Sequence, residues 1–430
     1  MRFLLTYVPA SLLFCLGSAY LIDLPGIYMD AVNPDYMVVH ILHPLATNLP
    51  VWSMPGNMLL GRFPLVGGIY SGALPLYLGL PIYWVFGTGI EGIRLSHMVF
   101  GLVVLTGGAA FLRAWNVRPL IVAIALCALA LDPAFLFAWR TQFYITLLPL
   151  APLFASVALT QSTREAASRR TAVLAGLLAG IACYGYFIFG FLVPTAFVHA
   201  WIVSRRSGQV TVIWWLAGFA MGVAPHALAA ALLWHATGGA ADFIAYIRGT
   251  LASLSPGQSH LALFQRVTLF FDYVRLSVLG YGPKAMMIQQ YPSSAPTLRL
   301  VLLLGLPLCG LGLWAIRKAK PPGLPLLAGF VVGLFCLVMA FGDRLWLHHF
   351  AVLVPILYLA CACVSEAVVR LVSGFTWSRI AAMTGPVLFG VLIGANVLDA
   401  KEVFSTLNRT GGGSVIIPTR STGLRSTASA

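Results

Sequence analysis

The segment Leu324–Phe341, "LPLLAGFVVGLFCLVMAF", decides the class of this protein. It contains no charged residue, and its length is close to the roughly 20 residues with which an α-helix crosses a bilayer. Similar apolar runs follow one another along most of the chain. Sixty per cent of all residues are apolar and nine per cent are charged, whereas soluble domains carry about 25% charged residues. The sequence therefore predicts an all-α polytopic membrane protein.

Eleven apolar segments are predicted to be transmembrane helices. They are residues 3–22, 93–112, 118–136, 142–160, 172–187, 188–203, 211–233, 298–316, 324–341, 346–369 and 380–398. A further apolar run, residues 69–87, is interrupted by Pro75 and Pro81 and is rich in glycine and aromatic residues. We expect this run to form a helix that lies at the membrane interface or dips into it.

The distribution of charge agrees with this topology. If the N-terminus is inside, the inner loops hold 13 of the 26 Lys and Arg residues with only Glu165 and Glu366 as acids, a net charge of 13 − 2 = +11. The rest of the chain carries 13 − 10 = +3. Short inner loops rich in Arg are what the positive-inside rule predicts. Because this charge follows the topology, no nucleic-acid partner is expected. An alternative for the N-terminus is a signal peptide cleaved near "GSA" at 17–19.

Cysteine and glycine patterns give no sign of a cofactor. The seven Cys residues all lie in apolar segments and form no C-x-x-C pair, so they are interpreted as small buried side chains. No P-loop and no G-x-G-x-x-G motif is present, so no nucleotide cofactor is expected. We expect one transmembrane domain over residues 1–400, with outer loops 23–92 and 234–297, and a flexible outer tail over residues 401–430.

Four short stretches carry a resemblance to a known family. In chain order they are "YMDAVNPDY" after the first predicted helix, "FPLVGGIYSGALPLYLGLPIYWVFGTGIEGIRLSHMVFG", "LALDPAFLFAWRTQFY" and "GDRLWLHHFAVLVP". Their order resembles that of the GT-C glycosyltransferases, which include the protein O-mannosyltransferases, the lipid A aminoarabinose transferases and lipopolysaccharide-core transferases. The resemblance implies a polyprenyl-phosphate sugar as donor. It also implies a site on the outer face of a membrane, here the bacterial inner membrane.

The sequence departs from that family in two places. Many members have Asp-Glu where this chain has Asp30-Ala31, so either Asp30 or Asp35 is a candidate for the base. The stretch "RTQFYITLL" after Arg140 lacks the acids that oligosaccharyltransferases place there, which removes a metal ligand and predicts a reaction without metal.

Sugar transfer to a hydroxyl needs a base for the acceptor proton and cations for the departing phosphate. A carboxylate supplies the first, and Arg, Lys or protonated His the second. The resemblance favours Asp30 as the base. Asp35 is the second candidate, although after Asn33-Pro34 it could equally cap a helix.

The candidate phosphate-binding residues are five cationic side chains. They are Arg344, His348, His349, Lys284 and Arg140. Arg344 and His348 are four residues apart and share a face if the helix has begun by then. Alternatively, these residues are helix ends and interface anchors. His40 and His43 could bind zinc with Asp35, but two His and one Asp are weak evidence for a metal site.

The predicted function is transfer of a sugar from a polyprenyl-phosphate carrier to a hydroxyl of a lipid-linked or cell-surface glycan, with inversion at the anomeric carbon. Two alternatives remain. A transporter or lipid flippase usually has paired halves and charges at mid-membrane, whereas the acids here gather outside the predicted spans. A glycan polymer ligase would have a similar composition.

Overall fold

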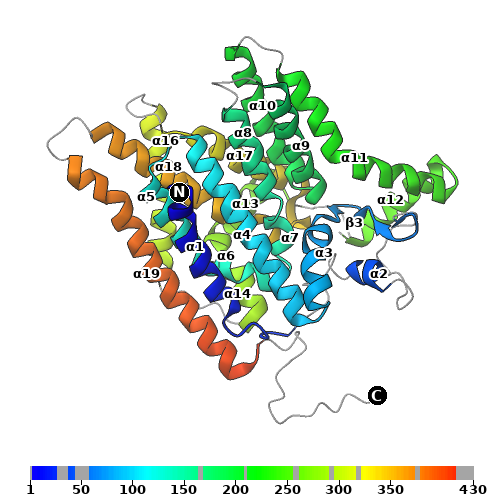
Figure 1. Ribbon diagram of the computed structural model, residues 1–430, viewed down its shortest axis with the longest axis horizontal. Coiled ribbons are helices and arrows are strands. Elements are labelled where there is room, and N and C mark those ends of the chain that lie inside the picture. The colour runs from blue at the N-terminus through cyan, green and yellow to red at the C-terminus, as the bar shows by residue number, and fades with distance from the viewer. Residues whose placement is uncertain are drawn as a thin grey trace.

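The structure, a computed structural model, describes residues 2–26, 37–43, 58–162, 168–207, 211–254, 261–289, 295–315, 321–372 and 378–412. Within these ranges the chain is a bundle of helices with two short hairpins at one side (Figure 1). Predicted residues Asp30 and Asp35 lie outside the described ranges, and of His40 only the backbone is described.

The first 162 residues contain two long helices, Arg2–Ala19 and Ile90–Ala114, with shorter helices and strands between them and after the second one. The elements are α1 (Arg2–Ala19), α2 (Val38–Leu42), β1 (Met58–Leu59), β2 (Phe63–Pro64), β3 (Val66–Gly68), β4 (Ser71–Gly72), α3 (Leu74–Phe86), α4 (Ile90–Ala114), α5 (Pro119–Ala130), α6 (Pro133–Leu136), η3 (Ala138–Arg140), α7 (Tyr144–Leu147) and α8 (Leu150–Ser162).

The remaining elements are almost all helices. They are α9 (Arg169–Gly185), α10 (Phe189–Ser207), α11 (Thr211–Thr237), α12 (Ala240–Leu254), α13 (Leu263–Val278), α14 (Tyr281–Ile288), α15 (Pro296–Leu300), η4 (Val301–Gly305), α16 (Leu306–Ala315), α17 (Leu324–Phe341), η5 (Gly342–Arg344), η6 (Leu347–Phe350), α18 (Leu353–Val372) and α19 (Ser378–Thr410). The predicted boundary between domain and tail at residue 400 falls inside α19, which continues to Thr410.

Six helical segments of the described chain are long and apolar enough to cross a membrane. They are Ile90–Ala114, Tyr144–Ser162, Val212–Thr237, Pro296–Ala315, Leu324–Arg344 and Leu347–Val372. The helices Pro119–Ala130 and Pro133–Arg140, bent by 63° at the break between them, would make a seventh span. The prediction of a helical protein with several membrane spans is confirmed. The other predicted spans correspond to α1, α9, α10 and α19, which do not meet the same test of length and composition.

Helix α18 forms the centre of the bundle. Every side chain from Leu353 to Ala367 is buried, and the helix packs against α5, α17 and α19. A helix that is apolar on all sides is stable only where neighbours surround it. Helix α19 runs along one side of the bundle, and α11 leads to α12 on the opposite side (Figure 1).

Helices α9 and α11 approach until their backbones touch. A Cβ atom added to Gly176 would lie 1.8 Å from the carbonyl oxygen of Trp215, and one added to Gly218 would lie 2.0 Å from that of Val173. Small residues at such positions replace side-chain packing by backbone contact, as they do in many membrane helix pairs.

The predicted interfacial run, residues 69–87, is only partly helical. Its first residues include β4, which pairs with β3 just before the run, and α3 begins at Leu74. The thirteen residues of α3 span about 20 Å, which is too short to cross a bilayer. Trp84 and Val85 are 80% and 70% exposed, as expected for side chains that contact lipid.

Candidate functional site

Two histidines and a tyrosine meet where η6 lies against the connection between α9 and α10. The Tyr186 hydroxyl oxygen lies 3.3 Å from Nε2 of His348 and 3.2 Å from Nε2 of His349. The centroids of the two imidazole rings are 4.1 Å apart. Gln142, just before α7, places its amide nitrogen 3.4 Å from Nδ1 of His348. We call Gln142, Tyr186, His348 and His349 the histidine cluster.

The backbone around η6 holds the histidine cluster in place. The Trp346 N–H donates to Nδ1 of His349 at 2.8 Å, and the Thr146 hydroxyl donates to the carbonyl oxygen of His348 at 2.8 Å. His349 is 6% exposed, and His348 is half-buried. The histidines are therefore oriented by α7 and by the residue before η6, and the accessible part of the cluster is the side of His348.

The loop between α1 and α4, which the sequence predicts to be the first outer loop, is tied to the histidine cluster by backbone contacts. Ser71 in β4 pairs with Tyr186 as an isolated β-bridge, and the Phe187 N–H donates to the carbonyl oxygen of Tyr70 at 2.9 Å. The rings of Tyr70 and Tyr186 meet edge to face at 5.8 Å. A loop that the sequence places near the predicted base thus reaches the residue that contacts both histidines.

Arg344 does not share a helix face with His348. The two lie in separate 3-10 helices, because Leu345 and Trp346 have extended backbone conformations between η5 and η6. A residue of α13 stabilises this break, since the Tyr273 hydroxyl donates to the carbonyl oxygen of Leu345 at 2.5 Å. Arg344 is half-buried and immediately precedes this break.

Arg140 binds the C-terminal end of α1. Nη1 donates to the carbonyl oxygens of Leu21 and Leu24 at 2.9 and 2.7 Å, and Nη2 to those of Ser18 and Tyr20 at 2.9 and 2.5 Å. The last carbonyls of a helix lack partners within the helix and favour a cation. Arg140 is 3% exposed, so its guanidinium is occupied by this role.

Arg94 reinforces the same segment. Its Nη2 donates to the carbonyl oxygen of Pro25 at 3.0 Å, and its side chain is 4% exposed. Two buried arginines therefore fix the chain from α1 to Pro25. Asp30 follows Pro25 by five residues, a distance of at most about 18 Å along an extended chain.

Lys284 belongs to a buried network of charges that sequence reasoning missed. Its Nζ lies 3.4 Å from Oδ2 of Asp399, and Nη1 of Arg299 lies 3.4 Å from the same oxygen. Nη2 of Arg299 lies 2.7 Å from Oδ2 of Asp132. All four side chains are fully buried. Burial lowers the pKa of Lys284, and the charge of Asp399 opposes that effect.

Two neutral side chains complete this network. The Tyr358 hydroxyl donates to Asp132 at 2.8 Å and accepts from the amide of Asn396 at 2.8 Å, while the Asn396 carbonyl oxygen accepts from Arg299 at 2.9 Å. The sequence contained a signal for this buried network. Asp132 and Arg299 both lie inside predicted spans, where an ionisable residue usually has a partner.

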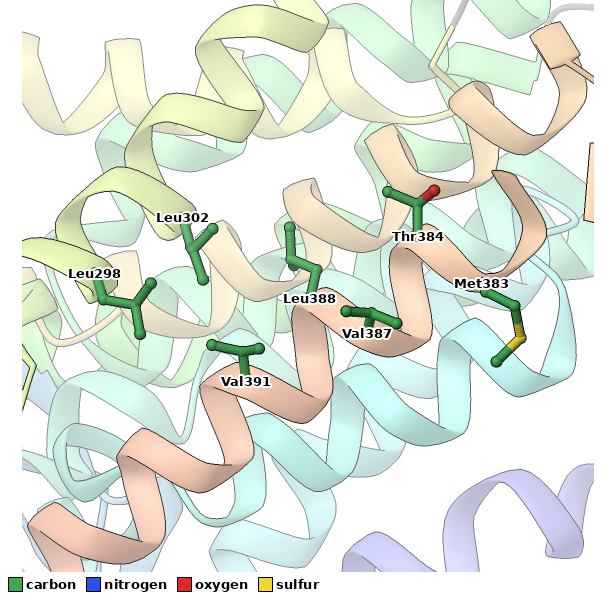
Figure 2. A pocket seen from close by; sticks show the side chains of 7 residues that line it. All are labelled: Leu298, Leu302, Met383, Thr384, Val387, Leu388 and Val391. Atoms are coloured by element: carbon green, nitrogen blue, oxygen red, sulfur yellow. The ribbon is translucent and has the colours of Figure 1, made fainter. Parts of the chain in front are cut away.

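The described residues form an apolar groove but no metal centre. In the ranges that the structure describes, no group of three or more His, Cys, Asp or Glu side chains could hold a metal ion. The groove, of about 510 Å³, lies between α15, η4 and α19 (Figure 2), and Thr384 is the one polar residue among its seven lining residues. Such a wall suits an aliphatic chain and offers nothing to a charged headgroup.

Comparison with known proteins identifies the fold. No family model matches the sequence, and no curated protein matches it. The structure is similar to the crystal structure of ArnT from Cupriavidus metallidurans bound to undecaprenyl phosphate, with a TM-score of 0.54 and 12% sequence identity. The match covers 94% of this chain and 75% of that one. The predicted resemblance to GT-C membrane glycosyltransferases is thus confirmed at the level of the fold.

Proposed function

We propose that this protein is a membrane glycosyltransferase that moves a sugar from a polyprenyl-phosphate carrier to a hydroxyl group of a lipid-linked or cell-surface glycan. The observation that carries the proposal is the ArnT-like fold over 94% of the chain. The ArnT crystal structure contains undecaprenyl phosphate, which supports a ligand of the same class here.

The reaction is a single displacement. The acceptor hydroxyl oxygen forms a bond to the anomeric carbon, and the bond between that carbon and the phosphate oxygen breaks with its electron pair staying on the phosphate. The carboxylate of Asp30 or of Asp35 takes the hydroxyl proton. Attack from the face opposite the phosphate inverts the anomeric centre. The leaving phosphate needs no proton, but its developing charge needs cations or hydrogen-bond donors nearby.

We assign contact with the phosphate first to Arg344 and His348. Arg344 is half-buried beside the break before η6, and His348 is the more accessible histidine of the histidine cluster. Tyr186 and Gln142 orient His348 from both ring nitrogens. His349, with its Nδ1 held by Trp346, supports the phosphate site from behind.

Lys284 and Arg140 act on the phosphate site without contacting the phosphate. The helix that carries Lys284 contacts this region, since a Cβ on Gly282 would lie 2.2 Å from the ring of Phe143, which itself packs on His348. Arg140 acts mainly by holding α1, and through it the chain that leads to Asp30. Both residues act by holding the elements around the site, since Asp132 and Asp399 balance the charges of Lys284 and Arg299.

The proposed membrane arrangement has eleven spans with the site on the outer face. Besides the segments that meet the test of length and apolarity, α1, α9, α10 and α19 would cross the bilayer. Helix α19, with 33 residues, is long enough for this, and α1, with 18, is close to the required length.

The test of this proposal is turnover of a defined carrier. Purified protein in lipid nanodiscs would be mixed with a panel of polyprenyl-phosphate sugars, and the release of polyprenyl phosphate would be followed by mass spectrometry. We expect one sugar to be consumed. If the folded protein neither binds nor consumes any carrier but moves lipid between leaflets, the alternative of a flippase replaces this proposal.

A further inference from the structure

A second pocket lies at the end of the bundle opposite the histidine cluster. It has a volume of about 650 Å³ and is lined by the last residues of α4, α8, α16 and α18, by α10 and by the start of α17. Gln142 lies just before the helical segment Tyr144–Ser162 and Gln161 lies at its end, and a helix of 19 residues is about 28 Å long. The pocket is therefore distinct from the candidate site.

One wall of this second pocket is polar and offers hydrogen-bond donors as well as acceptors. Gln161, Thr195 and Asn116 contribute amide and hydroxyl groups. The wall is suited to a ligand rich in acceptor oxygens.

A fixed positive charge lies at the rim. The Nε of Arg370 donates to Glu366 at 2.7 Å and its Nη2 donates to the carbonyl oxygen of Asn116 at 2.7 Å, yet 46% of its side chain is exposed. Other described arginines at this end of the bundle are Arg113, Arg118, Arg169, Arg170 and Arg205, and Glu366 is the described acid there. The local charge therefore favours an anion.

The opposite wall continues into the apolar surface of the bundle. Val198 and Ile202, on α10, line the pocket and are 52% and 42% exposed. Trp314 lines it too and is 46% exposed, as expected for an indole at the level of lipid headgroups. A soluble anion would make no use of this surface, whereas acyl chains would cover it.

We propose that this pocket binds the headgroup of an anionic phospholipid, with the phosphate beside Arg370 and the Gln161 amide and the acyl chains along Val198 and Ile202. Basic pockets between helices at a membrane surface are typical sites for such headgroups. The sequence-based topology places this end of the bundle at the inner leaflet, on the other side of the membrane from the proposed transfer reaction.

Native mass spectrometry of the purified full chain tests the proposal. The protein would be released from nanodiscs that contain phosphatidylglycerol and phosphatidylcholine in equal amounts, and retained lipid would be counted. We expect one phosphatidylglycerol to be retained. Arg370→Gln should lower its retention about fivefold, which corresponds to one basic group near an anionic headgroup, and Gln161→Leu should also lower it without breaking an ion pair.

Matched variants at the same end of the bundle separate a site from general charge. Arg205→Gln removes an exposed arginine that does not line the pocket, and Trp201→Ala removes a tryptophan about as exposed as Trp314. Both should retain lipid like the wild type, whereas Trp314→Ala should not. Equal retention of both lipids, an equal loss in Arg205→Gln and Arg370→Gln, or displacement of the lipid by millimolar glycerol phosphate would overturn the proposal.

Discussion

The guanidinium of Arg140 lies 2.7 Å from the carbonyl oxygen of Leu24, which places a buried cation at the point where the chain leaves α1. The same side chain binds four further carbonyls of that segment. Because this segment leads to Asp30, the position of α1 bears on the position of the proposed base. Arg140 is thereby a positioning residue in the proposed reaction.

Replacement of Arg140 should reduce both stability and turnover. In Arg140→Met, at least four carbonyls, two of them in buried hydrogen bonds, lose a charged donor, and the cost should reach several kcal/mol. Arg140→Lys keeps the charge but loses the planar fork, so we expect it to fold, to bind the carrier normally and to lower kcat more than KM. Thermal unfolding and transfer kinetics measure the two effects. Arg275→Lys, at an exposed ion pair with Asp272, is the control and should be neutral.

Removal of the Tyr186 hydroxyl tests the histidine cluster. Tyr186→Phe keeps the ring and its packing but leaves His348 and His349 without their shared partner. We expect transfer to fall about 10-fold to 100-fold, since loss of one preorganised group at a charged transition state has an effect of this order. Thermal stability should change little. Tyr246→Phe on α12 is the matched control, and an equal loss of activity there would argue against a specific role for the cluster.

The buried ion pairs predict an unequal response to charge removal. Arg299→Met leaves Asp132 and Asp399 without their shared cation, and breaking a buried pair in this way costs about 3–5 kcal/mol. Lys284→Met should cost less, because Asp399 keeps its contact with Arg299. Unfolding in detergent, followed by circular dichroism, would rank the two variants. A larger loss in Lys284→Met would show that Arg299 is not the cation that holds the network together.

The contact between α9 and α11 predicts a strong size limit at its glycines. Gly176→Val must push the backbone of α11 away, because a Cβ there would lie 1.8 Å from a carbonyl oxygen. We expect a fall of many degrees in the melting temperature. Gly190→Ala in α10 meets no atom within 4 Å and should be neutral or raise stability by up to about 1 kcal/mol. Similar melting temperatures for the two variants would show that α9 and α11 do not pack this closely.

Transfer should not depend on a divalent metal. The prediction comes from the absence of acids in "RTQFYITLL" after Arg140. Incubation with excess EDTA, followed by assay in metal-free buffer, should leave the rate unchanged. Loss of activity that returns on addition of Mg²⁺ or Mn²⁺ would show that a metal takes part.

Hydropathy is enough to predict the helices but not their breaks. Composition alone predicts the span Leu324–Phe341, which is α17 in the structure. Hydropathy also predicts one span over 118–136, yet α5 ends at Ala130, α6 begins at Pro133, and the two helical segments meet at an angle of 63°. Hydropathy does not register this break, because the residues on both sides of it are almost all apolar.

The partners of the charged residues cannot be predicted from the sequence in the same way. Residue type and position point to His348 and His349, but Tyr186 and Gln142, which contact them, come from segments 162 and 206 residues away from His348 in sequence. The sequence predicts that Arg140 binds phosphate. The structure shows its guanidinium bound to backbone carbonyls, and these partners cannot be predicted because every segment of a polypeptide offers carbonyls. Asp132 could have been recognised as a charged residue inside an apolar span.

The proposed mechanism requires a carboxylate after α1 to remove the acceptor proton, and two single variants test this requirement. Asp30→Asn and Asp35→Asn would be purified in nanodiscs and assayed with the polyprenyl-phosphate sugar that the wild type consumes, with carrier binding measured in parallel. We predict that both variants bind the carrier and that Asp30→Asn alone loses transfer by a factor of at least about 10². Loss of transfer in Asp35→Asn alone would identify Asp35, five residues later, as the base. Full activity in both variants would contradict the mechanism.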